Sequence, residues 1–236
     1  MANILESLSK VQSGDVVMSV RDIKRTFVEG GQPLHILKGG GFDLHRGEII
    51  ALVGQSGSGK STLLQCVGLL DRPSGGSILI NGVPVHKMDE DMRTQVRRKK
   101  IGFVYQRHNL LGDFTALENV MLPMLANGMS EDAAMARAMK LLRAANVAHR
   151  VSHRPGEMSG GEQQRTAVAR ALANNPDILL ADEPTGSLDP HNAESVFDLL
   201  MSLVRKNKMA MLFVTHDMNL AARADRTITI SDGIVQ

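Results

Sequence analysis

The sequence predicts an α/β fold with a parallel sheet at its core, and three observations predict it. Short, continuous apolar runs such as "EIIALV" (48–53) and "ILLAD" (178–182) are typical of strands buried on both faces. Segments with helical periodicity lie between such runs, and strand–helix–strand order implies parallel strands covered by helices. Residues 16–54 instead form short extended stretches separated by turns, which predicts a strand-rich region ahead of that core.

The elements follow in order along the chain. Strands are expected at "VVMSVRDI" and "LHILKGGGFDL", with the turn "GGQP" between them, and then at "EIIALVG" and "SGGSILING". Helical patterns cover 88–100 and 130–147, and the strand "IGFVY" (101–105) ends directly before Gln106. A helix over 190–206 separates the buried strands "ILLADEP" and "MAMLFVTHD". Residues from about 90 to 165 therefore form a helical insertion.

The helix predicted over 130–147 has a clear start. Ser130 is followed by two acidic residues, a favourable helix N-terminus. Met135, Ala138, Leu142 and Ala145 share one helical face by their spacing, and we expect that face to be buried.

Composition limits the classes of function. The formal net charge is +2 and aromatic residues make up 3% of the 236 residues, so neither a basic surface nor an aromatic platform predicts nucleic-acid binding. The single cysteine, Cys66, excludes an internal disulfide and is expected to be a small buried side chain. No apolar run is long enough to span a bilayer. Residues 1–15 lack the pattern of a secretory signal and are expected to form a short arm.

The stretch "GQSGSGKST" (54–62) carries the strongest local signal. It fits the pattern G-x-x-x-x-G-K-[ST], it follows an apolar strand, and it precedes a helix, whereas a chance glycine-rich turn would not require that context. In such a loop, backbone N–H groups and the helix N-terminus surround a phosphate. Lys60 would reach the β- and γ-phosphates and Ser61 would bind Mg²⁺, so the sequence predicts a nucleotide site.

Two consecutive acidic residues end the strand "ILLADEP". Asp182 suits a Mg²⁺ ligand, held directly or through water, and Glu183 suits a group that orients or deprotonates an attacking water. Alternation along a strand would place the two carboxylates on opposite sides. Alone, the pair is also typical of an acidic turn before a proline, but the upstream phosphate loop favours the catalytic interpretation.

The segment "MSGGEQQRTAVARAL" (158–172) begins a helix. Ser159 and Glu162 form the pattern of an ordinary capping box. A capping box does not need two consecutive glycines, which weaken the first helical turn. Bare backbone at a helix N-terminus is useful where a phosphate approaches closely. Because the chain's own phosphate loop already binds one, this segment predicts contact with the nucleotide of a second copy.

Together these motifs resemble the nucleotide-binding domain of ABC transporters. The resemblance rests on the phosphate loop, "SGGEQ" before "LLADEP", "SLD" after it and "FVTHD" further on, and it covers residues 16–236. It implies a RecA-like parallel-sheet core, an N-terminal antiparallel β subdomain and an inserted helical subdomain. A single ABC ATPase domain over 1–236 would then have its β subdomain and catalytic core in 16–90 and 166–236, and its Q-loop and helical subdomain in about 91–165.

The resemblance implies a role for each matching residue. Phe27 corresponds to the aromatic residue that stacks on adenine, although a tyrosine is more usual there. Gln106 corresponds to the Q-loop glutamine, Asp189 to the D-loop acid, and His216 to the switch histidine beside the γ-phosphate. Residues 159–162 correspond to the signature, whose commonest form is LSGGQ; Glu162 keeps an acceptor and adds a charge.

The implied catalytic residues are Glu183, His216, Gln106 and Lys60. The implied ligands of Mg²⁺ are Ser61, Gln106 and Asp182. The implied contacts with ATP are Phe27, Gly54, Gln55, Ser56, Gly57, Ser58, Gly59, Lys60, Ser61, Thr62, Ser159, Gly160, Gly161, Glu162 and Asp189.

The only dense basic run is "RTQVRRKK" (93–100). It suits either a patch for nucleic acid or anionic lipid, or a solvated helix face, and the balanced charge elsewhere favours the solvated face.

The subgroup within the family is indicated by two longer stretches, "FVYQRHNLLGDFTALENVMLPML" and "HRVSHRPGEMSGGEQQR". They resemble the ATPase of bacterial lipoprotein-releasing complexes; MacB-like exporters and FtsE-like division complexes are the alternatives. No long heptad insertion, as in DNA-maintenance ATPases, and no second cassette, as in translation factors, is present. The segment after Gln106 is expected to form the floor of a groove for a partner's coupling helix.

The resemblance also implies an assembly and a location. Two copies would bind two ATP molecules at their interface and act on two membrane-spanning subunits of that complex. The chain would be an ATPase at the cytoplasmic face of the bacterial inner membrane, reaching the membrane only through those partners and binding no nucleic acid. Its work would be the release of outer-membrane-directed lipoproteins to a periplasmic carrier.

Overall fold

The computed structural model describes residues 16–236, so the arm predicted over residues 1–15 lies outside the described part. Within it, the chain forms two compact units. One unit comprises residues 16–97 and 208–236, and the other comprises residues 98–207. No helix in residues 16–236 is both long and apolar enough to cross a membrane.

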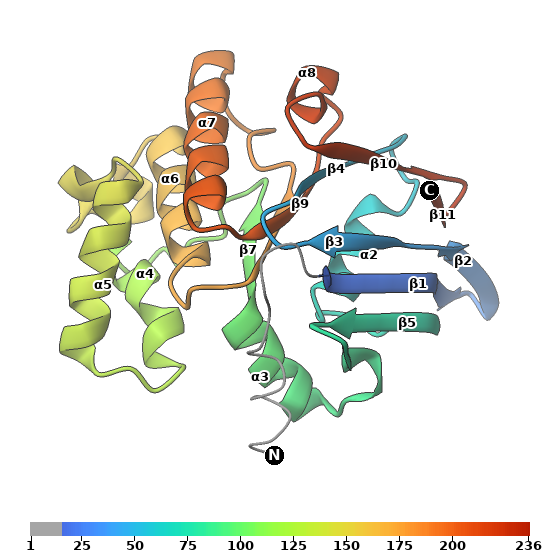
Figure 1. Ribbon diagram of the computed structural model, residues 1–236. Helices are drawn as coiled ribbons and strands as arrows, with labels where there is room; N and C mark the ends of the chain where they lie inside the picture. Colours follow the sequence, from blue (N-terminus) through green and yellow to red (C-terminus); the bar gives the residue numbers. More distant parts are fainter. Residues whose placement is uncertain (1–15) are drawn as a thin grey trace. The chain divides into compact units, whose positions relative to one another are not determined.

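The first unit is built on a sheet with both strand orientations. Its strand order is β6–β5–β1–β2–β11–β10–β4–β9, and β3 also pairs with β1. The long first strand is antiparallel to β2, β3 and β5, whereas β4 is parallel to β9 and β10. Figure 1 shows β1 beside β3 and β5. The strands are β1 (Val16–Glu29), β2 (Gln32–Gly40), β3 (Phe42–His45), β4 (Ile49–Val53), β5 (Gly75–Ile80), β6 (Val83–Pro84), β9 (Ala210–Val214), β10 (Arg226–Ser231) and β11 (Ile234–Val235).

Strand β4 is fully buried, as its continuous apolar sequence predicts, and it leads into helix α2 (Lys60–Val67). The cysteine of this helix, Cys66, is a buried free thiol, as predicted. Burial raises the pKa of the Cys66 thiol to about 12. The other helices that begin in this unit are η1 (Val85–Lys87), α3 (Glu90–Lys100) and α8 (Met218–Ala221).

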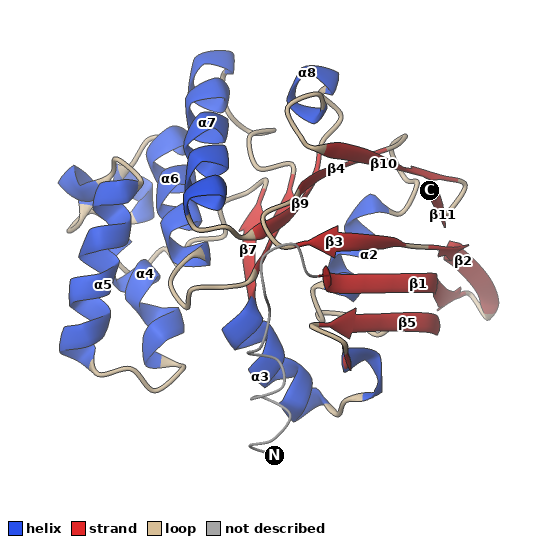
Figure 2. Cartoon of the chain, viewed as in Figure 1, coloured by secondary structure: helices blue, strands red, loops and turns tan. Residues whose placement is uncertain are grey.

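The second unit is mainly helical (Figure 2). Its two strands, β7 (Ile101–Tyr105) and β8 (Ile178–Asp182), are parallel neighbours. Both strands, and the helix predicted over 190–206, occur at the predicted positions. The helices are α4 (Ala116–Leu125), α5 (Glu131–Ala144), α6 (Gly160–Ala171) and α7 (Pro190–Lys206), with short 3₁₀ turns η2 (Ala148–Arg150) and η3 (Pro155–Glu157).

Helices α4, α5 and α6 pack around one apolar cluster, and α5 corrects one prediction. Ala134, Ala138 and Leu142 are fully buried, whereas Met135 is 42% exposed. A spacing of three and a spacing of four both fit a helical stripe, and the observed stripe uses four between its first members. The N-cap of α5 is Ser130, as predicted, but the Ser130 side chain makes no capping hydrogen bond.

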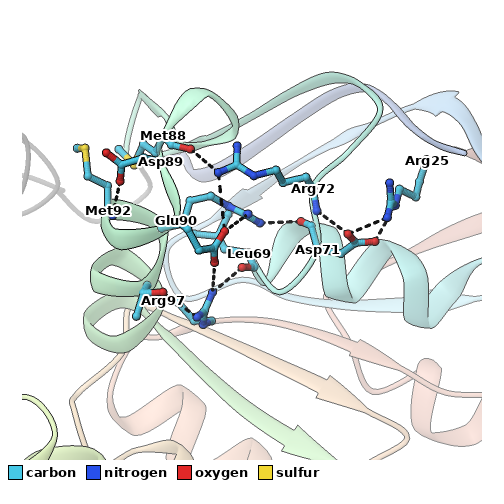
Figure 3. A network of polar contacts seen from close by, with 11 residues as sticks. Arg25, Leu69, Asp71, Arg72, Met88, Asp89, Glu90, Met92 and Arg97 are labelled. Atoms are coloured by element: carbon cyan, nitrogen blue, oxygen red, sulfur yellow. Dashed lines mark hydrogen bonds and ion pairs between the residues drawn. The ribbon is translucent and has the colours of Figure 1, made fainter. Parts of the chain in front are cut away.

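The basic run 93–100 is a second correction. The prediction of a solvated helix face fails at Arg93, which is only 2% exposed. Its guanidinium donates to the Asp71 carbonyl at 2.8 Å and to Glu90 at 2.7 Å, and Arg97 donates to the Leu69 carbonyl at 2.6 Å. Figure 3 shows this network around Asp71 and Glu90. These two arginines satisfy carbonyl groups beyond the end of α2, so they serve packing rather than solvation.

Candidate active site

The phosphate loop lies where the sequence predicts it, between β4 and α2. Its three glycines, Gly54, Gly57 and Gly59, all have a positive φ. Gly54 has a φ of 156°, and a Cβ there would lie 2.5 Å from the Ile230 carbonyl oxygen; Gly59 has a φ of 103°. Gly59 is also the N-cap of α2, so no side chain caps this helix, and its first turn holds no acidic residue. The first N–H groups of α2 therefore suit an anionic ligand.

Lys60 folds back over the loop that precedes it. Its Nζ donates to the carbonyl oxygens of Gly54 and Gln55, both at 2.8 Å. The Ser58 N–H donates to the Gln55 carbonyl at 3.2 Å and closes the turn. The lysine thus sets a positive charge over backbone that is already curled, which suits phosphate binding.

A cavity of about 650 Å³ borders the loop, within the size range of small-molecule sites. On one side it is lined by the first half of the phosphate loop, and on the other by β2 and the turn between β10 and β11. Phe27 does not line it, but Leu34, its cross-strand partner, does. The lining residues are Leu34, His35, Ile36, Lys38, Gly54, Gln55, Ser56, Gly57, Ser58, Thr229, Ile230, Ser231, Asp232 and Gly233.

Phe27 lies near the end of β1 and is half-buried. The guanidinium carbon of Arg25 lies 4.2 Å from the centre of the Phe27 ring, a cation–π contact. Arg25 is held in turn by Asp71, to which its Nε and one terminal nitrogen donate at 2.7 and 2.9 Å (Figure 3). One face of the ring is therefore covered by a fixed cation.

His216 follows β9, the parallel neighbour of β4. Because Leu52 is in register with Val214, the phosphate loop and His216 both leave the carboxyl ends of adjacent strands. Asp217 caps α8 by accepting from the Asn219 N–H at 2.8 Å, which fixes the turn that carries the exposed His216. Ligand sites of open α/β sheets form at such strand ends.

The second unit has the same arrangement at the ends of β7 and β8. Tyr105 is in register with Asp182, so Gln106 and Glu183 directly follow the ends of adjacent parallel strands. The Gln106 carbonyl accepts from the Ser187 Oγ at 2.7 Å. The structure thus brings Gln106 and Glu183 to one edge of this strand pair.

Glu183 does not continue the strand. Strand β8 ends at Asp182, and Glu183 has a φ of 44°, in the left-handed region that non-glycine residues rarely adopt. The chain turns at Glu183 instead of continuing as a strand. The predicted reason for separating the two carboxylates, alternation along a strand, is therefore wrong. Such a conformation costs about 1–3 kcal/mol and is typical of functional sites, where the surrounding structure holds it in place.

Gln164, on α6, is a candidate functional residue that the sequence motifs did not predict. It is 1% exposed, and its Nε2 donates to the carbonyl oxygens of Tyr105 at 2.8 Å and Pro184 at 2.7 Å. The signal was present in the sequence: a polar residue on the otherwise apolar stripe of α6 that includes Gly161 and Val168.

The predicted signature begins α6 with a complete capping box. Ser159 is the N-cap; its N–H donates to the Glu162 Oε2 at 2.8 Å, and the Glu162 N–H donates to the Ser159 Oγ at 3.3 Å. The Glu162 Oε1 accepts from the Arg150 Nε at 2.8 Å and contacts the His149 Nε2 at 3.0 Å. Chiefly through the Arg150 hydrogen bond, the pKa of Glu162 falls to about 2. Arg150 therefore compensates the charge that Glu162 adds to the signature.

The second glycine of the signature has a packing role within the chain. A Cβ at Gly161 would lie 2.8 Å from the Asn192 Oδ1, whereas a Cβ at Gly160 would reach only the Leu188 side chain, at 3.4 Å. Asn192 is fixed by Asp189, the N-cap of α7, which accepts from the Asn192 N–H at 3.1 Å and from its Nδ2 at 2.7 Å. Gly161 and Asp189 are thus joined through Asn192.

The predicted site residues are divided between the two units. Phe27, residues 54–62 and His216 lie in the first; Gln106, Asp182, Glu183, the signature and Asp189 lie in the second. Among residues 16–236, no cluster of three His, Cys, Asp or Glu side chains could hold a metal. The hydroxyl, amide and single carboxylate predicted to bind Mg²⁺ are hard oxygen donors, which suits this ion.

The fold and these motifs define an ABC transporter ATPase. Residues 37–186 match the family model described as ABC transporter, and the chain belongs to this family. It therefore binds ATP, and its activity is ATP hydrolysis coupled to transport.

Curated relatives and solved structures agree with this family assignment. The chain is 51% identical over 218 residues to the lipoprotein-releasing system ATP-binding protein LolD of Paramagnetospirillum magneticum, covering 92% of this chain and 96% of that protein. It is 50% identical to LolD 2 of Rhodopseudomonas palustris, covering 93% and 94%. The dimeric MJ0796 cassette bound to ADP and Pi is 39% identical, with a TM-score of 0.85 and coverage of 93% and 96%. CbiO1 from Clostridium perfringens is 26% identical, with a TM-score of 0.83 and coverage of 94% and 87%. These matches confirm the predicted fold class.

Proposed function

We propose that this chain is the ATP-hydrolysing subunit of a bacterial inner-membrane ABC complex that releases outer-membrane-directed lipoproteins to a periplasmic carrier. The observation that carries the proposal is the identity of about 50%, over more than nine-tenths of the chain, to proteins named LolD. The chain would be peripheral to the cytoplasmic face of that membrane. Its membrane-spanning partners would be two subunits of the LolC and LolE type.

The functional assembly that we propose is a homodimer of a single ABC ATPase domain, divided as the sequence predicts into 16–90, about 91–165 and 166–236. Each phosphate loop would face residues 159–162 of the other copy across a bound ATP. The dimeric form of the MJ0796 cassette supports this proposal. The packing of the signature supports it as well, because Gly160 has no close neighbour that requires a glycine.

Nucleotide binding is assigned mainly to residues of the first unit. Phe27 would stack on adenine, while the backbone of 54–59 and the N-terminus of α2 would hold the phosphates together with Lys60 and Thr62. Ser61, Gln106 and Asp182 would hold Mg²⁺, which supplies charge neutralisation at the phosphates when bound.

Hydrolysis is assigned mainly to residues that follow strand ends. Glu183 would orient or deprotonate the attacking water, and His216 would donate a hydrogen bond at the γ-phosphate. Lys60 would stabilise the charge that develops on the transferred phosphoryl group. Gln106 would sense the γ-phosphate. In the segment that follows it, Leu111 and Phe114 are 50% and 37% exposed. That segment is our candidate for the floor of the partner's groove.

The catalytic assignment is tested with Glu183→Gln, which keeps the shape of the side chain and removes its basicity. We expect ATP affinity to stay within about twofold and the hydrolysis rate to fall by about 10²–10³, with the ATP-bound dimer accumulating. Binding is measured by titration, turnover by phosphate release, and dimerisation by size-exclusion chromatography. Full turnover in this variant would overturn the assignment of Glu183.

The transport assignment is tested by depleting the chain in its host and following lipoprotein release from spheroplasts to the soluble carrier. We expect release to stop and to return with the wild-type chain but not with Glu183→Gln. Copurification identifies the membrane partners. Normal lipoprotein release on depletion would overturn the proposal and favour a MacB-like exporter or an FtsE-like division complex.

A further inference from the structure

Helix α6 carries the signature at its N-terminus and a buried amide one turn later. Gln164 is 1% exposed, and both of its described hydrogen bonds run from Nε2 to backbone carbonyls outside the helix. Those carbonyls belong to Tyr105 and Pro184, 59 and 20 residues away in the sequence. One side chain therefore joins α6 to the ends of β7 and β8.

The two carbonyl groups adjoin the residues assigned to hydrolysis. Tyr105 precedes Gln106, and Pro184 follows Glu183. Gln106 is held on its other side by the Ser187 Oγ, which donates to its carbonyl at 2.7 Å. The backbone on either side of Gln106 is thus fixed, on one side by the amide of Gln164.

Glu183 depends on its neighbours in the same way. Its φ of 44° is in a region that a glutamate does not favour, so the surrounding contacts must hold it there. One contact is the Gly186 N–H, which donates to the Glu183 carbonyl at 3.0 Å. A further contact in this turn is the hydrogen bond from Gln164 to the next carbonyl along the chain, that of Pro184.

The side chains of Gln106 and Glu183 both lie beside Gly186. A Cβ at Gly186 would lie 2.9 Å from the Gln106 Nε2 and 3.2 Å from the Glu183 Oε2. A small shift of either strand end would therefore change how these two groups are presented. Misplacement of a catalytic group by about 1 Å can cost about 10² in rate.

From these contacts we propose that Gln164 is a positioning residue for ATP hydrolysis, which aligns Gln106 and Glu183 by holding the ends of β7 and β8 to the signature helix. The proposal rests on the proposed function, because it takes Glu183 as the catalytic carboxylate. On this proposal, a displacement of α6 at the signature would move the ends of β7 and β8 together. In this role Gln164 would act through the backbone carbonyls of Tyr105 and Pro184.

The test is Gln164→Met, which keeps the length of the side chain and removes both donors. We expect kcat to fall by about 10–100-fold, with the KM for ATP and the ATP affinity within about twofold, because the phosphate loop is untouched. Gln164→Asn is the second variant if the methionine prevents folding; it keeps a buried amide but is one methylene shorter, so its donors no longer reach both carbonyls.

Asn174→Leu is the matched control. The Asn174 Nδ2 also donates to two carbonyls of separate segments, those of Arg98 at 3.1 Å and Pro123 at 3.0 Å, but at the other end of β7. Its loss should lower the melting temperature by an amount similar to the loss of Gln164, with kcat within about twofold of wild type. If both variants lose kcat equally at equal stability loss, Gln164 is only a structural residue and the proposal is overturned.

A combined variant separates this proposal from the proposed function. If Gln164 acts through Gln106 and Glu183, adding Gln164→Met to a chain that already carries Gln106→Ala and Glu183→Gln should lower the residual rate by less than about twofold. A full additional loss in this combined variant would overturn the positioning role. Full turnover in Glu183→Gln alone would instead overturn the catalytic assignment of Glu183.

Discussion

Helices α4 and α6 begin with the same capping box and differ in what surrounds it. In α4, Thr115 and Glu118 exchange hydrogen bonds of 2.7 and 3.2 Å; in α6, Ser159 and Glu162 exchange bonds of 2.8 and 3.3 Å. As local structure, the two helix starts are almost interchangeable. A capping box therefore explains where each helix begins and says nothing about function.

The differences lie between and beside the capping residues. Ala116 and Leu117 fill the first turn of α4, whereas α6 has two glycines there. The remaining contacts of Glu118 include the Thr115 hydroxyl, whereas Glu162 is held by Arg150 and His149. Glycine backbone and added charges are thus the features that distinguish the helix start proposed to face a nucleotide from the other one.

The glycines of α6 should give the largest effect. In Gly161→Ala, the new Cβ would displace Asn192 and its hydrogen bonds to Asp189, so we expect a stability loss of about 1–3 kcal/mol and an ATPase loss of at least about tenfold. Gly160→Ala has room for its Cβ and should stabilise the helix by up to about 1 kcal/mol, yet ATPase should still fall. Thermal unfolding and phosphate release measure both. Full ATPase in Gly160→Ala would show that bare backbone is not required there.

Removing the two N-caps should separate stability from activity. Ser159→Ala and Thr115→Ala should each destabilise the chain by about 1 kcal/mol, because each removes one capping acceptor. Only Ser159→Ala should also lower ATPase, by about tenfold. Chemical denaturation is compared with turnover for both variants, and equal ATPase in the two would remove the functional distinction between the helices.

Charge compensation at Glu162 should give a smaller effect. Arg150→Ala leaves the carboxylate without its closest cation, so the ATP concentration for half-maximal hydrolysis should rise by about threefold to tenfold. Glu162→Gln should restore it in the double variant. Arg154→Ala, which removes an equal charge from the same segment, is the control. If Glu162→Gln does not restore the wild-type value, Arg150 does not act by compensating the charge of Glu162.

The pH dependence of stability should give the smallest effect. The Arg150 guanidinium holds the pKa of Glu162 at about 2, while an unfolded glutamate titrates near about 4.3. Because the folded pKa is the lower one, the carboxylate stabilises the fold above about pH 4.3, and this stabilisation is lost as the pH falls toward 2. The contribution should stay below about 1 kcal/mol, since the pair is partly exposed.

Urea midpoints of wild type and Glu162→Gln between pH 3 and pH 7 measure this effect. Their difference should be constant above about pH 5 and should narrow below it. Glu118→Gln is the comparison, because the Thr115 N–H also lowers the pKa of Glu118. A difference for Glu162→Gln that does not change with pH would contradict the assignment.

Motifs and strand ends could be predicted because they depend on local sequence. The strand that ends before Gln106 and the helix over 190–206 follow from continuous apolar runs and periodicity, and the structure has both at those positions. The phosphate loop was equally predictable, since its curl depends on glycines within nine residues.

Features that depend on distant contacts were not predictable in this way. The Gln164 donors meet carbonyls from two other segments, and the burial of Arg93 depends on a carbonyl beyond α2. Strand β8 ends at Asp182 and the Gly186 N–H of the following turn bonds to the Glu183 carbonyl, so side-chain alternation along a strand does not apply to Glu183. In α5, both candidate spacings fitted the pattern, and only packing against α4 and α6 selected Ala134 over Met135.

The burial of Cys66 has a practical consequence for spectroscopy. This thiol is the only cysteine of the chain, and with its pKa near 12 almost none of it is thiolate at neutral pH. Maleimide dyes and spin labels should therefore not react with Cys66. Labelling at an introduced cysteine then needs no prior removal of Cys66. A cysteine introduced at exposed Leu111 would carry a single reporter, placed where a membrane partner is proposed to dock.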